Sequence, residues 1–227
     1  MSIPVVDFSA YGLNEKAATD EQLRALSKEL KKALTEVGFV FLKNTGIAEE
    51  EVRPADAIKA ARRFLKVLQA EYACFIFWVC GVTADENGTT LRSLYYPPVN
   101  SEKAKEGQLR CGEHSDYGTI TLLFQNSDGL QVRRRSGEFI CAPTIPGAVL
   151  INVADLMQRW TSDQFVSVLH RVLLPPVGDC STRQSLAFFV QPDDEALITC
   201  CDGSNKYPPV SAGAYLIERF NDSYGRN

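Results

Sequence analysis

Residues 114–132 read HSDYGTITLLFQNSDGLQV, in which a short polar motif precedes two apolar runs that are separated by a turn signal. The first run is Ile120–Phe124, and Ser127-Asp128-Gly129 separates it from the second, Leu130–Val132. Short apolar runs bounded by Ser, Asp and Gly are typical of β-strands joined by turns. This stretch therefore predicts two neighbouring strands.

The same alternation of short apolar runs and turn signals continues on both sides of this stretch. The further runs are Leu91–Tyr96, Phe139–Cys141, Ala148–Val153, Val166–Leu174 and Ser185–Val190. Pro97-Pro98, Ser136-Gly137 and Pro146-Gly147 are among the turn signals between them. Many short strands at this spacing predict a β-sandwich or barrel.

The N-terminal part has a different, largely helical pattern. Thr19 or Asp20 is a suitable N-cap, and apolar residues then recur at helical spacing as far as Gly38, a suitable stop. Further strands are predicted at Ile3–Phe8 and Phe39–Leu42, and further helices at Glu49–Val79 and Ser211–Tyr224. We expect a mainly β (α+β) protein with N-terminal helices and a C-terminal helix, divided into residues 1–88, 89–195 and 196–227.

Composition and charge argue against nucleic-acid and membrane partners. The formal net charge of the 227 residues is −4, without the basic excess of a nucleic-acid-binding protein. The run Arg133-Arg134-Arg135 precedes Ser136-Gly137, which favours a solvated hairpin tip over a phosphate patch. The most apolar stretch, Tyr72–Val82, has about eleven residues, whereas a membrane span needs roughly 20. We therefore expect this stretch to be buried core.

The N-terminus and the cysteines favour a cytoplasmic protein. Met1–Phe8 has neither the basic nor the apolar part of a secretory signal. The cysteines number seven and form no C-x-x-C pair, which favours reduced thiols and argues against a cysteine-bound zinc site. Imidazole chemistry must use His114 or His170, the two histidines of the chain.

A candidate metal site follows from the motif His114-Ser115-Asp116. On an extended strand, residues i and i+2 point to the same side, so the imidazole and the carboxylate can meet at one point. His170 lies on another apolar run and can supply a third ligand. Two histidines and one carboxylate form the facial triad of non-haem iron(II) oxygenases. The alternatives are a chance H-x-D pair and a structural histidine on an apolar strand.

A candidate anion site follows from Arg183-Gln184-Ser185. Arg183 and Ser185 would face the interior together, and a buried arginine is costly unless it is paired. A dicarboxylate co-substrate would supply the pair, because a guanidinium binds a carboxylate through two hydrogen bonds. The alternative is an arginine in an ordinary ion pair.

These motifs and several flanking segments resemble a known family. The segments are Ile3–Phe8, Gly38–Ile47, Leu94–Pro98, His114-Ser115-Asp116, Asp155–Thr161, His170-Arg171-Val172 and Arg183-Gln184-Ser185. In this order they resemble the 2-oxoglutarate/iron(II)-dependent oxygenase superfamily, and its isopenicillin N synthase-like branch in particular. The resemblance implies a double-stranded β-helix (jelly roll) core.

The resemblance also implies roles for six residues. His114, Asp116 and His170 would hold Fe(II), and Arg183 and Ser185 would bind the distal carboxylate of 2-oxoglutarate. Tyr96 matches a tyrosine that contacts the same co-substrate. Leu94 stands where the family often has asparagine, which puts that one contact in doubt.

The activity implied by the resemblance is oxidation, usually hydroxylation, of a small organic molecule. Dioxygen and 2-oxoglutarate would be consumed, and succinate and carbon dioxide would be the co-products. The oligomeric state is left open.

The chain departs from the family between its first helices and Leu91, where relatives carry several tens of residues more. Loss of that segment would leave an exposed sheet edge and a more open pocket. Two alternatives therefore stand beside the dioxygenase hypothesis. One is a catalytically impaired or non-catalytic variant, and the other is an oxidase that does not use 2-oxoglutarate.

Overall fold

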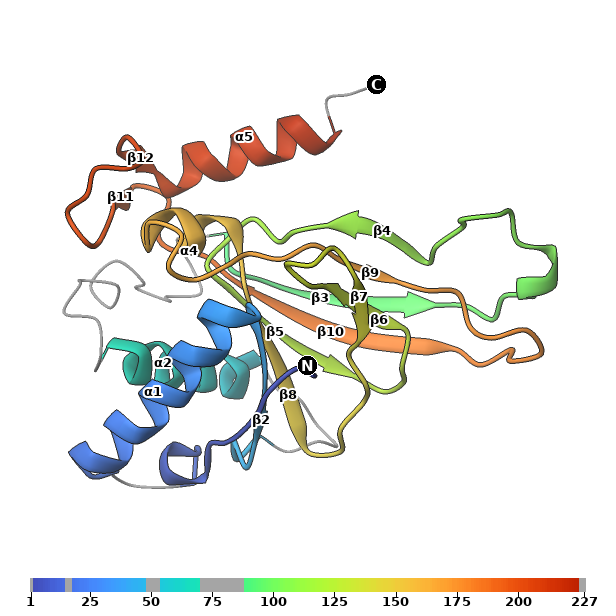
Figure 1. Ribbon diagram of the computed structural model, residues 1–227, viewed down its shortest axis with the longest axis horizontal. Helices are drawn as coiled ribbons and strands as arrows, with labels where there is room; N and C mark the ends of the chain where they lie inside the picture. Colours follow the sequence, from blue (N-terminus) through green and yellow to red (C-terminus); the bar gives the residue numbers. More distant parts are fainter. Residues whose placement is uncertain (1, 15–17, 48–53, 70–87, 225–227) are drawn as a thin grey trace.

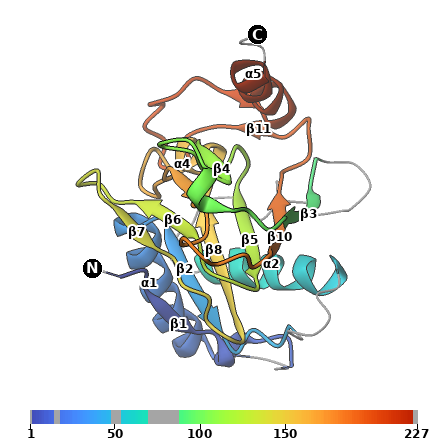
Figure 2. The same ribbon diagram turned by 90° about the vertical axis from the view of Figure 1, so that its right-hand side faces the viewer.

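The protein is built around two β-sheets that pack face to face (Figures 1 and 2). The computed structural model describes residues 2–14, 18–47, 54–69 and 88–224. The larger sheet has the strand order β1-β2-β8-β5-β10-β3, and the smaller one has the order β4-β9-β6-β7. This arrangement is a jelly roll with N-terminal helices and a C-terminal helix, so the predicted fold class is confirmed.

The elements follow one another as the apolar runs predict. The strands are β1 Val5–Asp7, β2 Phe39–Lys43, β3 Thr90–Tyr96, β4 Cys111–His114, β5 Ile120–Gln125, β6 Leu130–Arg133, β7 Phe139–Cys141, β8 Ala148–Val153, β9 His170–Val172, β10 Arg183–Val190, β11 Leu197–Ile198 and β12 Val210–Ser211. The α-helices are α1 Asp20–Glu36, α2 Pro54–Gln69, α4 Asp155–Trp160 and α5 Ala212–Tyr224, with 3₁₀ turns at Ser9–Tyr11 and Ser101–Lys103.

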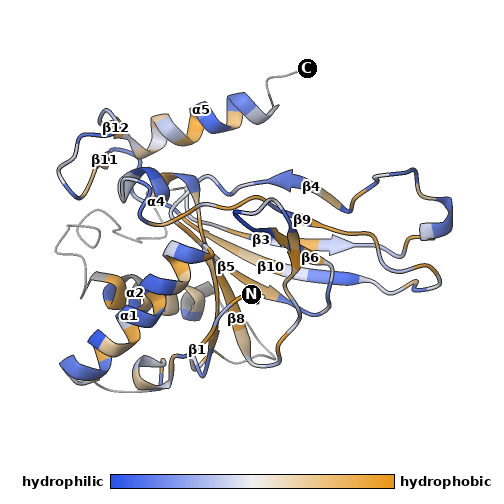
Figure 3. Cartoon of the chain, in the orientation of Figure 1, coloured by the Kyte–Doolittle hydropathy of each residue, from blue (hydrophilic) through white to orange (hydrophobic). Residues whose placement is uncertain are grey.

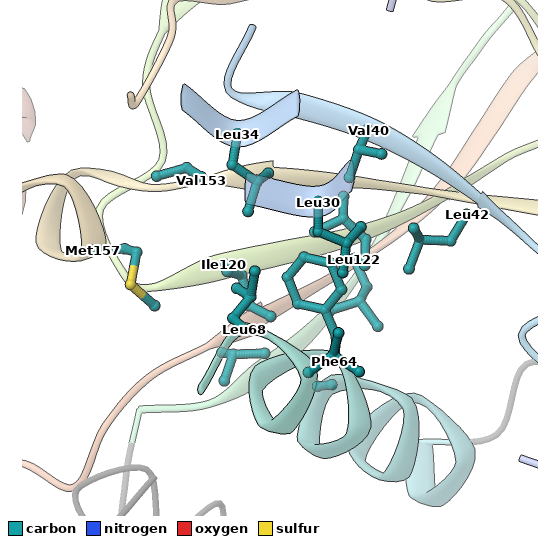
Figure 4. Close-up of a cluster of buried hydrophobic side chains, with 14 of the residues drawn as sticks. Leu30, Leu34, Val40, Leu42, Phe64, Leu68, Ile120, Leu122, Val153 and Met157 are labelled. Carbon is teal, nitrogen blue, oxygen red and sulfur yellow. The ribbon is translucent and has the colours of Figure 1, made fainter. Parts of the chain in front are cut away.

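In the larger sheet, β2, β5 and β8 are largely buried on both faces, which explains why they read as continuous apolar runs. These runs are orange in the hydropathy colouring of Figure 3. Phe39 and Phe41 point towards the smaller sheet, whereas Val40 and Leu42 point towards the helices. On that outer face α1 and α2 contribute side chains such as Leu30 to one core with β5 and β8 (Figure 4). The helices thus support the sheet from outside and leave its inner face for the site.

Helix α1 begins and ends close to the N-cap and stop residues that the sequence predicts. The Thr19 hydroxyl accepts a hydrogen bond from the backbone of Gln22, and the Gln22 side chain accepts one from Thr19, which forms a capping box. Gly38 follows the helix at φ 75°, in the left-handed region that favours glycine. Helix α2 begins at Pro54, and the expected continuation to Val79 lies outside the described residues, as does Tyr72–Val82.

Two predicted strands are shorter than expected. The run Val166–Leu174 yields only the strand β9, because Val166 donates its backbone hydrogen bond to Leu34 of α1 rather than to a neighbouring strand. Strand β4 ends at His114, so Asp116 lies in the loop that follows. The expectation that one extended strand carries both His114 and Asp116 is therefore wrong. The short pair of β11 and β12 was not predicted from the sequence.

Two surface features can be compared with the sequence. Arg134 lies in the turn of the β6–β7 hairpin and pairs with Glu138, which confirms a solvated hairpin tip. Strand β3 pairs only with β10 among the described strands, and Tyr95 on it is 60% exposed, consistent with an open sheet edge. Within the described ranges, no helix is long and apolar enough to cross a membrane.

Candidate functional site

Three side chains with metal-binding atoms meet between the two sheets. The ligand atoms of His114, Asp116 and His170 all lie within 4.8 Å of one another. Oδ1 of Asp116 is 3.7 Å from Nε2 of His170 and 4.0 Å from Nε2 of His114. The three residues that sequence analysis selected therefore do form one cluster, with two imidazole nitrogens and one carboxylate oxygen facing a common point.

Strand pairing and a loop bring the cluster together. His114 at the end of β4 is the register partner of His170 at the start of β9, so the two rings lie side by side with centroids 4.3 Å apart. Asp116 is fixed by the backbone, because its carbonyl accepts a 2.9 Å hydrogen bond from the amide of Asp155 at the start of α4. Phe39 packs edge-on against His170 and closes the site from β2.

Backbone carbonyls orient both histidine rings. Nδ1 of His114 lies 2.8 Å from the carbonyl of Gly112, and Nδ1 of His170 lies 3.1 Å from the carbonyl of Val168. A carbonyl only accepts, so each Nδ1 donates, and Nε2 is the nitrogen that can offer a lone pair when the ring is neutral. Histidines that bind metals are usually held in this way.

Two polar residues orient the carboxylate of Asp116, and sequence analysis missed both. Oδ2 of Asp116 accepts hydrogen bonds from Oγ1 of Thr121 at 2.6 Å and from Nδ2 of Asn152 at 2.8 Å. Thr121 and Asn152 are register partners on β5 and β8, and both are buried. They leave Oδ1 directed at the histidines. A polar residue inside each of two apolar runs was the available signal, because buried polar groups need partners.

The electrostatics of the cluster favour a positive charge. Burial alone would lower the pKa of His114, but its contacts with Cys111, the Gly112 carbonyl and Asp116 outweigh burial and raise this pKa to about 9. Burial lowers the pKa of His170, which favours a neutral imidazole there. A divalent metal ion would take the place of the proton that the raised pKa keeps on His114, beside a neutral His170 and the Asp116 carboxylate.

Arg183 lies at the other end of the same space and lacks an anionic partner. It is 1% exposed, and its guanidinium donates to Oγ of Ser185 at 3.3 Å and to Oε1 of Gln125 at 2.8 Å. Its Nε has no hydrogen-bond partner, and no carboxylate of the described chain lies within 4 Å. Burial lowers the pKa of Arg183, which reflects an uncompensated charge. The alternative of an ordinary ion pair is therefore not observed in this part of the molecule.

One cavity connects the two ends. It has a volume of about 110 Å³. All six residues selected from the sequence line it: Tyr96, His114, Asp116, His170, Arg183 and Ser185. The ring of Tyr96 lies 5.2 Å from Cζ of Arg183. Leu94 also lines the cavity, as the register partner of Ser185, and gives it an apolar surface there.

A second cavity of about 330 Å³ lies beside His114 and Asp116. It shares Arg92, His114, Asp116 and Phe189 with the first cavity. Helix α5 forms part of its wall through Leu216 and Phe220. Sequence analysis selected none of the residues of this wall, because their positions around the cavity depend on how α5 packs.

Comparisons with known proteins agree with this geometry. Residues 87–192 match the family described as "2OG-Fe(II) oxygenase superfamily". Residues 3–71 match the family described as "non-haem dioxygenase in morphine synthesis N-terminal". The first match includes the metal-binding cluster and Arg183, and the second includes β1, β2 and α1.

Individual relatives cover part or all of the chain. The 2-oxoglutarate-Fe(II) type oxidoreductase ppzD of Metarhizium rileyi is 35% identical over 152 residues, which are 62% of this chain and 43% of the relative. The 2-oxoglutarate-dependent dioxygenase htyE of Aspergillus rugulosus is 42% identical over 122 residues, 49% of this chain and 37% of the relative. The match thus spans less than half of the length of these relatives.

A solved structure resembles nearly the whole chain. A full-length Neurospora crassa protein, crystallised in complex with alpha-KG and 5-formyluracil, superposes with a TM-score of 0.82 at 25% identity over 96% of this chain and 95% of that one. The two matched families, the relatives and the shared fold lead to one conclusion. The chain belongs to the 2OG-Fe(II) oxygenase superfamily.

Proposed function

We propose that this protein is an iron(II)- and 2-oxoglutarate-dependent dioxygenase that oxidises, and in the simplest case hydroxylates, a small organic molecule. The observation that carries the proposal is a buried arginine without an anionic partner, in the same cavity as a His/Asp/His cluster. The family supplies the cofactors, which are Fe(II), 2-oxoglutarate and dioxygen.

The proposed metal ligands are His114, Asp116 and His170. Their donor atoms converge, and three ligands on one side leave the other side open for co-substrates. The Gly112 and Val168 carbonyls and the pair Thr121 and Asn152 would hold these ligands ready before the metal arrives. When bound, iron(II) with 2-oxoglutarate and dioxygen supplies the oxidising power for attack on a C–H bond, with succinate and carbon dioxide as co-products.

The proposed co-substrate site is Arg183 with Ser185 and Tyr96. The guanidinium would pair with the distal carboxylate of 2-oxoglutarate, which compensates the buried charge and gives its Nε an acceptor. The Ser185 hydroxyl is within reach of the same carboxylate, since it already contacts Arg183. Apolar neighbours such as Leu94 and Val172 would exclude water from the co-substrate.

A cytoplasmic location belongs to the same proposal. Five cysteines of the described chain are free thiols, which fits a reducing compartment. The formal net charge of −4 favours a small-molecule substrate over a nucleic acid.

Succinate release tests the proposal. The full chain is supplied with iron(II), ascorbate and 2-oxoglutarate, first alone and then with a panel of small organic molecules, and succinate and oxygen are both measured. We expect slow succinate release without a substrate and faster release with one. Consumption of oxygen without 2-oxoglutarate would identify an oxidase instead. Absence of succinate from a folded, iron-loaded chain would identify a non-catalytic variant.

A further inference from the structure

The inner face of β3 and β10 runs without a break from the co-substrate end to the second cavity. On β10, Arg183 and Ser185 are followed at every second residue by Ala187 and Phe189, so all face the same side. Arg92 on β3 is the register partner of Ala187. The face therefore carries Arg183 deep in the first cavity and Arg92 at the junction of both cavities.

Arg92 is a second cation that lines the cavities, although the residue as a whole is exposed. No carboxylate lies within 4 Å of its guanidinium among the residues that the structure covers. Its Cζ lies 5.8 Å from the ring of Phe189, which keeps the guanidinium beside the apolar wall. Arg92 lines the cavity together with the metal-binding residues His114 and Asp116. An anion bound by Arg92 would thus lie close to the reacting centre.

Gln191 adds a buried amide to the same cavity. The residue is 7% exposed, its backbone pairs with Thr89, and its side chain lines the cavity. Gly118 makes room for this amide, because a Cβ at residue 118 would lie 2.5 Å from both amide heavy atoms. An amide that lines a cavity offers both a donor and an acceptor, so this position suits a ligand that carries a hydrogen-bonding group.

Helix α5 supplies the apolar side of the cavity and is tied to the loop of the metal site. Phe220 packs at right angles against Tyr117, with ring centroids 5.5 Å apart. Arg219 pairs with Asp155 at 2.7 Å, and Asp155 in turn accepts a hydrogen bond from Ser115. These contacts hold Leu216 and Phe220 over the cavity, opposite Phe189.

We propose that the substrate oxidised by this protein is a small organic acid with an apolar or aromatic body. Its carboxylate pairs with Arg92, its body lies between Phe189 and the α5 residues Leu216 and Phe220, and Gln191 binds a polar group of the body. The proposal rests on the function proposed above, since it places this acid beside the metal ligands. The cavity volume of about 330 Å³ lies at the small end of ligand pockets.

Equilibrium binding tests the proposal without requiring turnover. The full chain is loaded with manganese(II) and saturated with 2-oxoglutarate under anaerobic conditions, so that the Arg183 end is filled. Phenylacetate, 3-phenylpropionate and N-acetylphenylalanine are then titrated alongside their primary amides by calorimetry. The variants are Arg92→Gln and Gln191→Leu, with Gly118→Ala as a second way of displacing the amide. Arg24→Gln on the exposed face of α1 is the matched control for loss of one positive charge.

We expect the unsubstituted chain to bind at least one acid more tightly than the corresponding amide. Arg92→Gln should lower the affinity for that acid about tenfold or more and leave the affinity for the amide unchanged. Gln191→Leu and Gly118→Ala should each lower the affinity for N-acetylphenylalanine more than the affinity for phenylacetate, because the amide of N-acetylphenylalanine can pair with Gln191. Arg24→Gln should bind like the unsubstituted chain.

Three results would overturn the proposal. The first is a preference for the acid over its amide that survives Arg92→Gln, and the second is failure of every acid to bind in the millimolar range. The third is a rise in the dissociation constant of 2-oxoglutarate in Arg92→Gln, which would assign Arg92 to the co-substrate. Arg92-dependent binding of an acid in a chain that never releases succinate would instead refute the dioxygenase function and leave the acid site in place.

Discussion

Asn152 donates a 2.8 Å hydrogen bond to Oδ2 of Asp116, and this oxygen is the one turned away from the two histidines. Thr121, the register partner of Asn152, donates to the same oxygen at 2.6 Å. Two strands of the larger sheet thus fix the carboxylate before any metal is present. Oδ1 is left for the metal, and the carboxylate loses its freedom to rotate away.

Thr121→Val should therefore lower iron affinity by about 10–100-fold, because it removes one donor to Asp116 at constant shape. Iron(II) binding is measured by anaerobic titration. Thr119→Val is the matched control, since Thr119 is also buried but donates to the Val190 carbonyl and not to Asp116. Equal affinities of the two variants would show that Thr121 has only a structural role.

His114→Ala should abolish stoichiometric iron binding, because two protein ligands remain and the cluster loses one corner. Metal content after reconstitution and desalting measures the effect. Glu113→Gln on the same strand is the control, because Glu113 is exposed and its ion pair with Arg171 contributes at most about 1 kcal/mol. One iron per chain retained in His114→Ala would contradict the assignment of the triad.

Arg183→Lys should raise the 2-oxoglutarate concentration needed for half-maximal succinate release, since an ammonium cannot pair with a carboxylate through two parallel hydrogen bonds. Removal of a charge-assisted hydrogen bond of this kind costs about 1.5–3 kcal/mol, or a factor of about 10–100. Arg171→Lys, at a half-buried arginine outside both cavities, should leave this concentration unchanged. An unaltered half-saturation in Arg183→Lys would rule out the proposed role.

Sequence analysis located the strands of the large sheet and six of the residues that line the first cavity, for two physical reasons. Burial on both faces makes strands such as Ala148–Val153 apolar apart from Asn152, and the chemistry of the site needs histidine, aspartate and arginine, which are conspicuous in or beside such runs. It placed Asp116 on a strand wrongly, because the end of β4 depends on pairing with β9 and not on local residue preferences.

The substrate side of the site could not be derived in the same way. Arg92 looks like an ordinary surface residue in the sequence, and its inward direction follows only from its register with Ala187. The Gln191 amide has room in the cavity because Gly118 carries no side chain. Gly118 lies between β4 and β5, far from Gln191 in the sequence. Such relationships depend on tertiary packing. The division at residues 88 and 195 and the assignment to the isopenicillin N synthase-like branch stay predictions.

Gly38 joins α1 to β2 at φ 75°. A Cβ at this position would lie 2.3 Å from the carbonyl oxygen of Val166 and 2.8 Å from Cγ2 of Val168. Both contacts are with the segment that leads to His170, and the Val168 carbonyl orients the ring of His170. An added methyl group cannot be accommodated by a side-chain rotation, because the nearest atom belongs to the backbone.

Gly38→Ala should therefore lower the free energy of unfolding by about 1–3 kcal/mol for the left-handed backbone alone, and by more once the contact with Val166 is included. Gly137→Ala is the matched control, since Gly137 lies at φ 89° on the hairpin tip, where the nearest atom would be 4.0 Å from the added Cβ. Urea denaturation of both variants separates the two contributions. We expect Gly38→Ala to lose more stability than Gly137→Ala and also to bind iron more weakly, because the Val168 carbonyl must shift. Equal losses of stability, with iron affinity unchanged, would mean that the Val166–Val168 segment moves freely and that Gly38 does not hold His170 in place.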